Sequence, residues 1–510
     1  MPNFYDLEPD RQRSEGLRRL FQYVRRIVEP YHPFLRQRYR EAGIDTRRLR
    51  TLDDLRLLPI IDKDDLRADP TAFVLQPRTE ENAHLGTVPL SKGQLARYMA
   101  QALFNRPRDF TRLCRSQSFR EQVRRRALLE WNPVHFHASG GTTGKPVMAA
   151  YTHWELTRIL PQLAGLAVLQ SKWPKEGEPP YDWADRGLNL FPGAPHLAFF
   201  GSVLAKTAAG LACFDTGGGH VIPTERQIAL FESGKFTALL AVPSYLVHWL
   251  RRALDLQQAG TVGPLTGLKH IVLGAEPVGN ALRAAITELA VQAGAHPRVV
   301  IHETLGMTEM KWWFGECSAG SGLHLEPRHY FWELLHPETR LPVPEGEPGV
   351  LVFSHIGWRG TAFIRYWTGD LVRGGMRWSR CEHCGYTFPR IFGPICRAVK
   401  DFTKLKGTRV DLSALTATVR DTAGVRQFQI SLECEDASGG IGRDRLVIQV
   451  FPEANENRQE LQRRLQDRVK QATEVMPDEI TWEDDERTLT ERLFAKTGIK
   501  AEYVVDRRGL

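Results

Sequence analysis

The sequence predicts an α/β protein whose large N-terminal domain is built on mostly parallel sheets, followed by a small α+β C-terminal domain. With 510 residues, 42% of them apolar, the chain is too long for one hydrophobic core and should divide into two or three domains. From Val134 onward, short apolar runs alternate with amphipathic helical patterns, as in a parallel sheet covered by helices. Beyond residue 401 the pattern changes to a compact module of strands and charged helices.

The expected elements follow along the chain. In residues 1–79, apolar residues spaced three and four apart, such as Leu17, Leu20 and Val24, predict the helical part of the large domain. Residues 80–130 are polar and basic, and we expect an insertion or lid there. Residues 131–400 should form the core of the large domain, with strands at 238–242, 271–273, 299–301 and 350–353. In residues 401–510 we expect strands at 427–432, 446–451 and 503–505, and a helix at 456–472.

Charge and composition argue against several function classes. The net charge is +8, and part of the excess lies in arginines between Arg106 and Arg126, which are typical of a solvated helical face. No aromatic stacking pattern accompanies them, so we expect no nucleic-acid partner. The N-terminus lacks the basic and hydrophobic segments of a signal peptide, and the most apolar stretch, 197–214, contains Lys206. We therefore expect a cytoplasmic protein without a membrane span.

A glycine-rich string is the most informative motif. It follows the apolar-alternating run 134–137 and comprises Ser139, Gly140, Gly141, Thr142, Thr143, Gly144 and Lys145. Glycines let backbone N–H groups turn inward, the hydroxyls add donors and Lys145 adds a mobile positive charge, so the string suits a polyphosphate. Because proline follows Lys145, the string does not match the Walker-type pattern, and an ordinary loop between strands is the alternative.

The cysteines suggest a metal site. Seven cysteines in a chain of this length, without a secretion signal, argue against a disulfide scaffold. The two-residue spacing of the 381–384 string is that of a zinc knuckle, with another cysteine and a histidine upstream. Cys396 and His383 are alternative ligands, and a site without zinc is left open. The predicted ligands of a structural zinc ion are Cys317, His324, Cys381 and Cys384.

The glycine-rich string resembles the phosphate-binding signature of the adenylate-forming superfamily, which includes acyl-CoA synthetases, peptide-synthetase adenylation domains and luciferases. Four further stretches agree with that family in the same order, at 305–309, 365–371, 404–409 and 497–501. The runs 39–45 and 52–66 and the strings 242–245 and 274–277 are similar to the phenylacetate-CoA ligase branch. This resemblance implies that the two domains are joined by a hinge, for which Asp401 is the candidate.

The resemblance also implies an activity. The chain would be an ATP-dependent, AMP-forming ligase that activates a carboxylic acid, with aromatic acids among the candidates, as an acyl-adenylate and transfers it to CoA as a thioester. The partners would be the small-molecule acid, ATP, Mg²⁺ and CoA. Transfer to an amine or a carrier protein, or a nucleotide-binding regulator without turnover, are the alternatives. Whether the chain forms a homodimer is left open.

The resemblance implies roles for individual residues of the matched motifs. Lys145 would bind phosphate, Thr308 and Glu309 would complete the Mg²⁺ site, and Asp370 would bind the ribose. Lys500 would bridge carboxylate and α-phosphate during adenylation, with Lys496 as its rival. Further nucleotide contacts are implied for Gly274, Ala275, Glu276, Pro277, Gly306 and Lys404. The implied acyl-pocket residues are His196, Phe199, Tyr245 and Leu305, the last of which stands where the family has a tyrosine.

Overall fold

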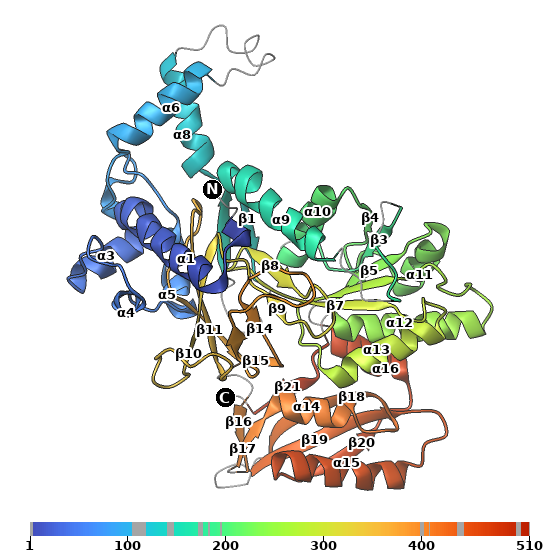
Figure 1. Cartoon of the computed structure of the whole chain (residues 1–510). Coiled ribbons are helices and arrows are strands. Elements are labelled where there is room, and N and C mark those ends of the chain that lie inside the picture. Colours follow the sequence, from blue (N-terminus) through green and yellow to red (C-terminus); the bar gives the residue numbers. More distant parts are fainter. Residues whose placement is uncertain are drawn as a thin grey trace.

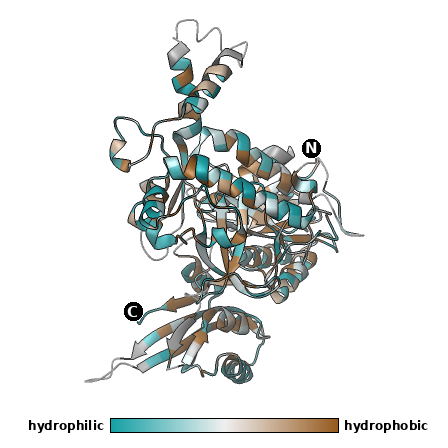
Figure 2. Ribbon diagram, turned by 60° about the vertical axis from the view of Figure 1, so that its left-hand side comes forward, coloured by the Kyte–Doolittle hydropathy of each residue, from teal (hydrophilic) through white to brown (hydrophobic). Residues whose placement is uncertain are grey.

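The computed structural model describes residues 4–104, 119–139, 147–171, 177–181, 184–193, 196–397, 402–406, 408–435, 443–495 and 501–508. Figure 1 shows a large body, a smaller C-terminal domain below it, and a helical hairpin projecting at the opposite end. Apolar residues gather on the strands inside the molecule, whereas polar residues predominate on the outer helices (Figure 2). Within the described ranges, no helix combines the length and apolar character needed to cross a membrane.

The N-terminal segment is helical, as predicted. Leu17, Leu20 and Val24 are buried in a core shared with the antiparallel strands of the large body. Two short helices begin with capping boxes at Thr51 and Asp62, in which a side chain and a backbone N–H satisfy each other reciprocally. The helices are α1 (Pro9–Tyr23), α2 (Glu29–Tyr31), α3 (Pro33–Glu41), α4 (Leu52–Leu55) and α5 (Lys63–Ala68).

The projecting hairpin occupies most of the predicted insertion. It consists of α6 (Lys92–Phe104) and α8 (Phe119–Trp131). Its base is tied to the body by the buried Glu130 carboxylate, which accepts hydrogen bonds from the Tyr98 hydroxyl at 2.7 Å and from Arg359 Nε at 2.7 Å. Burial of these charge-assisted bonds fixes the direction in which the hairpin leaves the body. Its role as a lid stays a prediction.

A six-stranded sheet forms the centre of the large body. Its strand order is β4-β3-β5-β6-β7-β8, and all neighbours are parallel except β7 and β8. The strands are β3 (Arg186–Asn189), β4 (Ala212–Asp215), β5 (Ala238–Ala241), β6 (His270–Leu273), β7 (Val300–Met307) and β8 (Trp312–Gly315). The helices that accompany it are α9 (Leu160–Ser171), α10 (Leu197–Ala209), α11 (Thr224–Ser233), α12 (Pro243–Gln258) and α13 (Asn280–Gln292). Strand predictions at 238–242, 271–273 and 299–301 are confirmed.

The remaining sheets of the large body correct the prediction of mostly parallel sheets. Residues 350–353 lie in β11 (Gly349–His355), the second strand of a wholly antiparallel sheet β10-β11-β12-β15. Every residue of β11 is buried, and a strand buried on both faces reads like a parallel one. The other antiparallel strands are β1 (Pro133–Ala138), β2 (Met148–Thr152), β9 (Leu323–His324), β10 (Tyr330–Leu335), β12 (Tyr366–Val372), β13 (Met376–Arg377), β14 (Arg390–Ile391) and β15 (Ile395–Arg397).

The C-terminal domain has its own core around a four-stranded sheet in the order β20-β19-β18-β21. The strands predicted at 427–432, 446–451 and 503–505 and the helix at 456–472 are all present. One helix, α16, contacts both this sheet and the large domain: Glu486 pairs with Arg426 of β18, and the rings of Phe494 and Tyr245 lie 6.0 Å apart. The elements are β16 (Phe402–Leu405), β17 (Thr408–Asp411), α14 (Leu412–Arg420), β18 (Val425–Glu435), β19 (Arg443–Pro452), α15 (Arg458–Thr473), β20 (Glu479–Trp482), α16 (Glu486–Phe494) and β21 (Val504–Asp506).

Candidate active site

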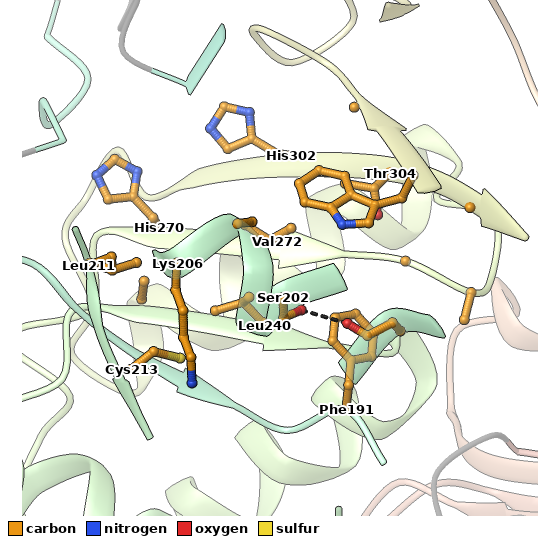
Figure 3. A pocket seen from close by; sticks show the side chains of 18 of the residues that line it. Phe191, Ser202, Lys206, Leu211, Cys213, Leu240, His270, Val272, His302 and Thr304 are labelled. Carbon is orange, nitrogen blue, oxygen red and sulfur yellow. Dashed lines mark hydrogen bonds between the residues drawn. The ribbon is translucent and has the colours of Figure 1, made fainter. Parts of the chain in front are cut away.

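A mostly apolar cavity of about 190 Å³ lies between α10 and one face of the six-stranded sheet (Figure 3). Alternate residues of a strand point to the same face, so every second residue of the central strands reaches the cavity. From the sheet the lining residues are Cys213, Ala238, Leu240, His270, Val272, Gly274, His302, Thr304, Gly306, Trp313 and Gly315. From α10 they are Leu197, Ala198, Ser202, Ala205 and Lys206, and Phe191 precedes that helix.

Three predicted nucleotide residues line the cavity: Gly274 and Ala275 directly follow β6, and Gly306 lies near the carboxyl end of β7. A Cβ at Gly274 would lie 2.6 Å from Thr304 Oγ1, and one at Gly306 would lie 2.7 Å from Trp313 Cβ. Neither position accommodates a side chain without displacing its neighbour. The two glycines therefore keep this end of the cavity open at the edge of a parallel sheet where ligands commonly bind.

The loop after β6 carries the other predicted adenine contacts. Ala275 has a left-handed backbone with φ 73°, a conformation rarely adopted by residues with a side chain, and is exposed. The Glu276 carboxylate accepts hydrogen bonds from Ser244 N at 3.0 Å and Ser244 Oγ at 2.9 Å, which ties the loop to the start of α12. Ala501 N approaches Ser244 Oγ at 3.4 Å. The C-terminal segment thus reaches the same loop, beside exposed Pro277.

Thr308 and Glu309 lie in the turn between β7 and β8, and both are buried. The Tyr366 hydroxyl donates a hydrogen bond to Glu309 Oε1 at 3.0 Å. Tyr366 begins β12, and Asp370 lies four residues further along the same strand, also buried. The predicted Mg²⁺ and ribose residues are therefore linked through one strand.

Several predicted residues lie at the edge of the described part or outside it. Ser139 directly follows β1, and its hydroxyl accepts a hydrogen bond from Val147 N at 3.0 Å. Lys404 lies in β16. The following predicted residues lie outside the described residues: Gly140, Gly141, Thr142, Thr143, Gly144, Lys145, Asp401, Lys496 and Lys500.

The structure does not bring the four predicted acyl-pocket residues to this cavity. His196 directly precedes α10 and Phe199 lies on that helix, whose residues Leu197 and Ala198 line the cavity instead. Leu305 lies between the cavity-lining residues Thr304 and Gly306. It packs against the core that the N-terminal helices share with the antiparallel strands. The Tyr245 hydroxyl hydrogen-bonds Gln227 Oε1 at 3.0 Å within the core of α11 and α12.

The four predicted metal ligands come together. Their ligand atoms all lie within 4.8 Å of one another. Cys317 Sγ and Cys381 Sγ are 3.7 Å apart, and Cys384 Sγ is 3.4 Å from His324 Nε2. A tetrahedral zinc with bonds of about 2.3 Å places two ligand sulfurs about 3.8 Å apart, so the spacing fits that ion, and it is far too long for a disulfide. His324 Nδ1 lies 2.9 Å from the Gly322 carbonyl, which leaves Nε2 for the metal.

Glu303, on the sheet face opposite His302, supports the loop after β6 by accepting a hydrogen bond from Val278 N at 3.0 Å. Burial raises the pKa of Glu303 to about 7. Because the folded-state pKa exceeds the unfolded value, this carboxyl favours folding below pH about 4.3, and that contribution is lost as the pH rises through 7.

We expect Glu303→Gln to be more stable than the parent at pH 8 by about 1–2 kcal/mol, and no more stable at pH 5. The uncharged amide keeps an acceptor for Val278 and removes the cost of burying a charge. Urea unfolding at both pH values measures the difference. Glu288→Gln, on the exposed side of α13, is the matched control and should show no such pH dependence. Equal stability of Glu303→Gln and the parent at pH 8 would contradict this account.

Comparison with known proteins adds to this geometry. The family model described as "AMP-binding enzyme" matches residues 67–358. A phenylacetate-coenzyme A ligase of Thermus thermophilus is 28% identical over 404 residues, covering 78% of this chain and 72% of the relative. The phenylacetate-coenzyme A ligase of Escherichia coli is 27% identical over 241 residues, covering 47% of this chain and 51% of that protein.

Solved structures share the fold. A 2-hydroxyisobutyryl-CoA ligase in its postadenylation state, in complex with an acyl-adenylate, superposes with a TM-score of 0.72 at 18% identity, covering 100% of this chain and 92% of that one. The same ligase in its thioesterification state, with CoA, gives a TM-score of 0.55 at 20% identity, covering 99% and 92%.

Proposed function

The chain belongs to the AMP-binding enzyme family, and from that membership we propose that it is an AMP-forming acid–CoA ligase. It would convert a carboxylic acid and ATP into an acyl-adenylate and pyrophosphate, and then transfer the acyl group to CoA. The observation that carries the proposal is the cavity that opens between Gly274 and Gly306, beside the loop and the turn that hold Glu276 and Glu309. An acid in the cavity would present its carboxylate to a nucleotide at this edge.

The proposed chemistry needs a polyanion to be held and its growing charge to be neutralised. Ser139 to Lys145 would cradle the phosphates, and Asp370 would accept hydrogen bonds from the ribose. The buried Glu309 carboxylate, oriented by the Tyr366 hydroxyl, would bind Mg²⁺, which prefers carboxylate and phosphate oxygens. The bound Mg²⁺ would neutralise phosphate charge.

The C-terminal domain would deliver Lys500 to the same edge. Supporting this, the next residue, Ala501, lies beside Ser244, which holds Glu276. The chain superposes better on the postadenylation structure than on the thioesterification structure. Rotation of the C-terminal domain about a hinge near Asp401 would account for this difference. A mobile lysine suits a step that is needed only in one arrangement.

We propose that Cys317, His324, Cys381 and Cys384 hold one zinc ion. Four protein ligands complete a tetrahedron and leave no open position, so the ion would be structural. It would tie the strand-end segment after β8 to the loop between β13 and β14.

The function is tested by pyrophosphate release from ATP and Mg²⁺ with a panel of aromatic and short aliphatic acids, with and without CoA. Release that requires one acid and rises with CoA is the expected result. Acid-dependent release that is the same with and without CoA would indicate another acceptor of the acyl group, such as an amine or a carrier protein. If the chain binds ATP but releases no pyrophosphate with any of the acids, the proposal that it is a ligase is overturned.

We expect Glu309→Gln to lower the rate of pyrophosphate release about 10²–10³-fold, because the amide keeps the shape of the side chain but loses the charge that would bind Mg²⁺. The Mg²⁺ concentration for half-maximal rate should rise as well. Glu338→Gln, the same change at an exposed position, should match the parent. An unchanged rate and an unchanged Mg²⁺ dependence in Glu309→Gln would contradict the proposed role of Glu309 in binding Mg²⁺.

A further inference from the structure

Two histidines form the end of the cavity that is remote from Gly274 and Gly306. His270 and His302 lie on neighbouring strands, and Figure 3 shows both rings at the same end of the cavity. Their exposed fractions are 8% and 7%. Among the described residues, neither His270 Nε2 nor His302 Nδ1 has a hydrogen-bond partner.

Both rings are neutral near pH 7. Burial lowers the pKa of His270 to about 4 and that of His302 to about 4. A neutral imidazole carries one N–H donor and one acceptor nitrogen. A buried polar atom without a partner carries a free-energy cost of about 1–3 kcal/mol, so a ligand group that satisfies these atoms would be bound in preference to an apolar one.

Among the described lining residues, the charged Glu316 is paired with Arg283. Lys206 is paired with Asp215, and burial raises the pKa of the Cys213 thiol to about 12, so the thiol is uncharged. Apolar walls such as Leu240 and Val272, with the rings of Phe191 and Trp313, favour an aromatic body. The ligand's polar group that contacts the histidines should therefore be uncharged, because no described residue of the cavity would neutralise a carboxylate placed there.

The dimensions place this polar group far from the reacting carboxylate. His270 begins β6 and Gly274 directly follows it, and His302 and Gly306 both lie on β7; four residues of extended chain span about 13 Å. An apolar cavity of about 150 Å³ holds one benzene, so about 190 Å³ accommodates a ring with a short chain. The chain would lead to the glycines, and the opposite side of the ring would face the histidines.

We propose that His270 and His302 select aromatic acids that carry a hydroxyl group on the ring, opposite the carboxylate-bearing chain. This inference rests on the proposed ligase function. A phenolic hydroxyl both donates and accepts, so it satisfies either histidine tautomer, which a methyl or a carbonyl group does not. A site built to hydrogen-bond a hydroxyl rejects the analogue that lacks it, because its own polar atoms are then left unpaired.

The experiment compares three acids at each of two chain lengths. These are phenylacetic and phenylpropanoic acid, each with its para-hydroxy and para-methyl derivatives. Pyrophosphate release gives kcat/KM for every acid, and isothermal titration with the acids alone gives affinity without turnover. We expect the parent to prefer the hydroxy acid over the methyl acid by about tenfold or more at one chain length.

The variants are His270→Leu and His302→Leu, tested separately, with His84→Leu at an exposed position as the matched control. Each cavity variant should lose most of the hydroxy preference, measured as the ratio of kcat/KM for the hydroxy acid to kcat/KM for the methyl acid, and the control should keep the parent's ratio. The ratio of kcat/KM for two acids, measured on one preparation, does not depend on the fraction of the protein that is folded. His302→Asn, which retains a hydrogen-bonding side chain, should recover part of the preference.

The outcomes separate this inference from the proposed function. Acid-dependent release with no hydroxy preference, or with a preference that both leucine variants retain, would overturn the histidine role and leave the ligase intact. If no acid supports release, the ligase proposal fails, and the titrations decide whether the cavity still binds hydroxy acids through the histidines. Equal affinities for the hydroxy and methyl acids there would overturn the inference as well.

Discussion

Cys384→Ser is expected to lower the zinc content from one ion per chain to well below one and to reduce the unfolding temperature by about 5–10 °C. The proposed zinc ion would join two segments that are distant in the chain, since Cys317 and Cys381 are 64 residues apart and His324 and Cys384 are 60 apart. Binding to a structural site of this kind releases about 10–16 kcal/mol in zinc-finger peptides, part of which stabilises the fold. A shift of this size corresponds to a few kcal/mol in a chain of several domains.

Elemental analysis and thermal unfolding of the purified chain measure both quantities. Cys396→Ser is the matched control, because Cys396 is buried on β15, where its thiol lies 3.9 Å from the Leu371 carbonyl and outside the ligand cluster. It should retain the zinc. Because no proposed catalytic step uses the ion, Cys384→Ser should still release pyrophosphate well below its unfolding temperature. Full zinc retention in Cys384→Ser would contradict the ligand assignment.

The ligand cluster was predictable because its signal is local. The two-residue spacing of Cys381 and Cys384 places two thiols on one turn, and the cluster then needs only Cys317 and His324 from one neighbouring segment. The strand at 350–353 was also predictable as a strand, but not its direction. A run of buried apolar residues is alike in parallel and antiparallel sheets, and only the partner strands decide.

The cavity was not predictable in the same way. It forms from alternate residues of several strands, so it depends on strand order and on which face α10 covers. Leu305 was predicted as an acyl-pocket residue, whereas the adjacent residues Thr304 and Gly306 line this cavity. A signal for the histidines was nevertheless present. His270 with Val272, and His302 with Thr304, each follow the period of two, so recognising β6 and β7 as neighbours would have placed both rings on one face.

The other large effect is expected from Lys311→Met, which should destabilise the chain by about 3–5 kcal/mol. Lys311 Nζ lies 2.7 Å from Glu155 Oε1, and both side chains are fully buried. The same carboxylate accepts hydrogen bonds from Thr152 N at 2.7 Å and Gly360 N at 2.9 Å, so it joins β2 to the segment before β12. Removing the ammonium would leave a buried carboxylate without its counter-charge.

The double variant Glu155→Gln, Lys311→Met separates the loss of the pair from the loss of shape. The amide introduced at position 155 would still accept the backbone hydrogen bonds without carrying a charge, so the double variant should be more stable than Lys311→Met alone by at least about 1 kcal/mol. Lys92→Met, at an exposed position on α6, controls for the substitution itself and should change stability by less than about 0.5 kcal/mol. Urea unfolding of the parent, both single variants of the pair and the double variant gives the coupling energy.

The pair also connects stability to the proposed chemistry. Lys311 has a left-handed backbone with φ 64° and lies two residues after Glu309, and its Nζ is 4.6 Å from the Tyr151 ring centroid on β2, the strand that follows the glycine-rich string. If this contact positions Glu309, the folded double variant should release pyrophosphate more slowly than Lys92→Met. A double variant with the parent's rate would restrict the pair to stability, and Lys311→Met with unchanged stability would contradict the expected cost of the unpaired carboxylate.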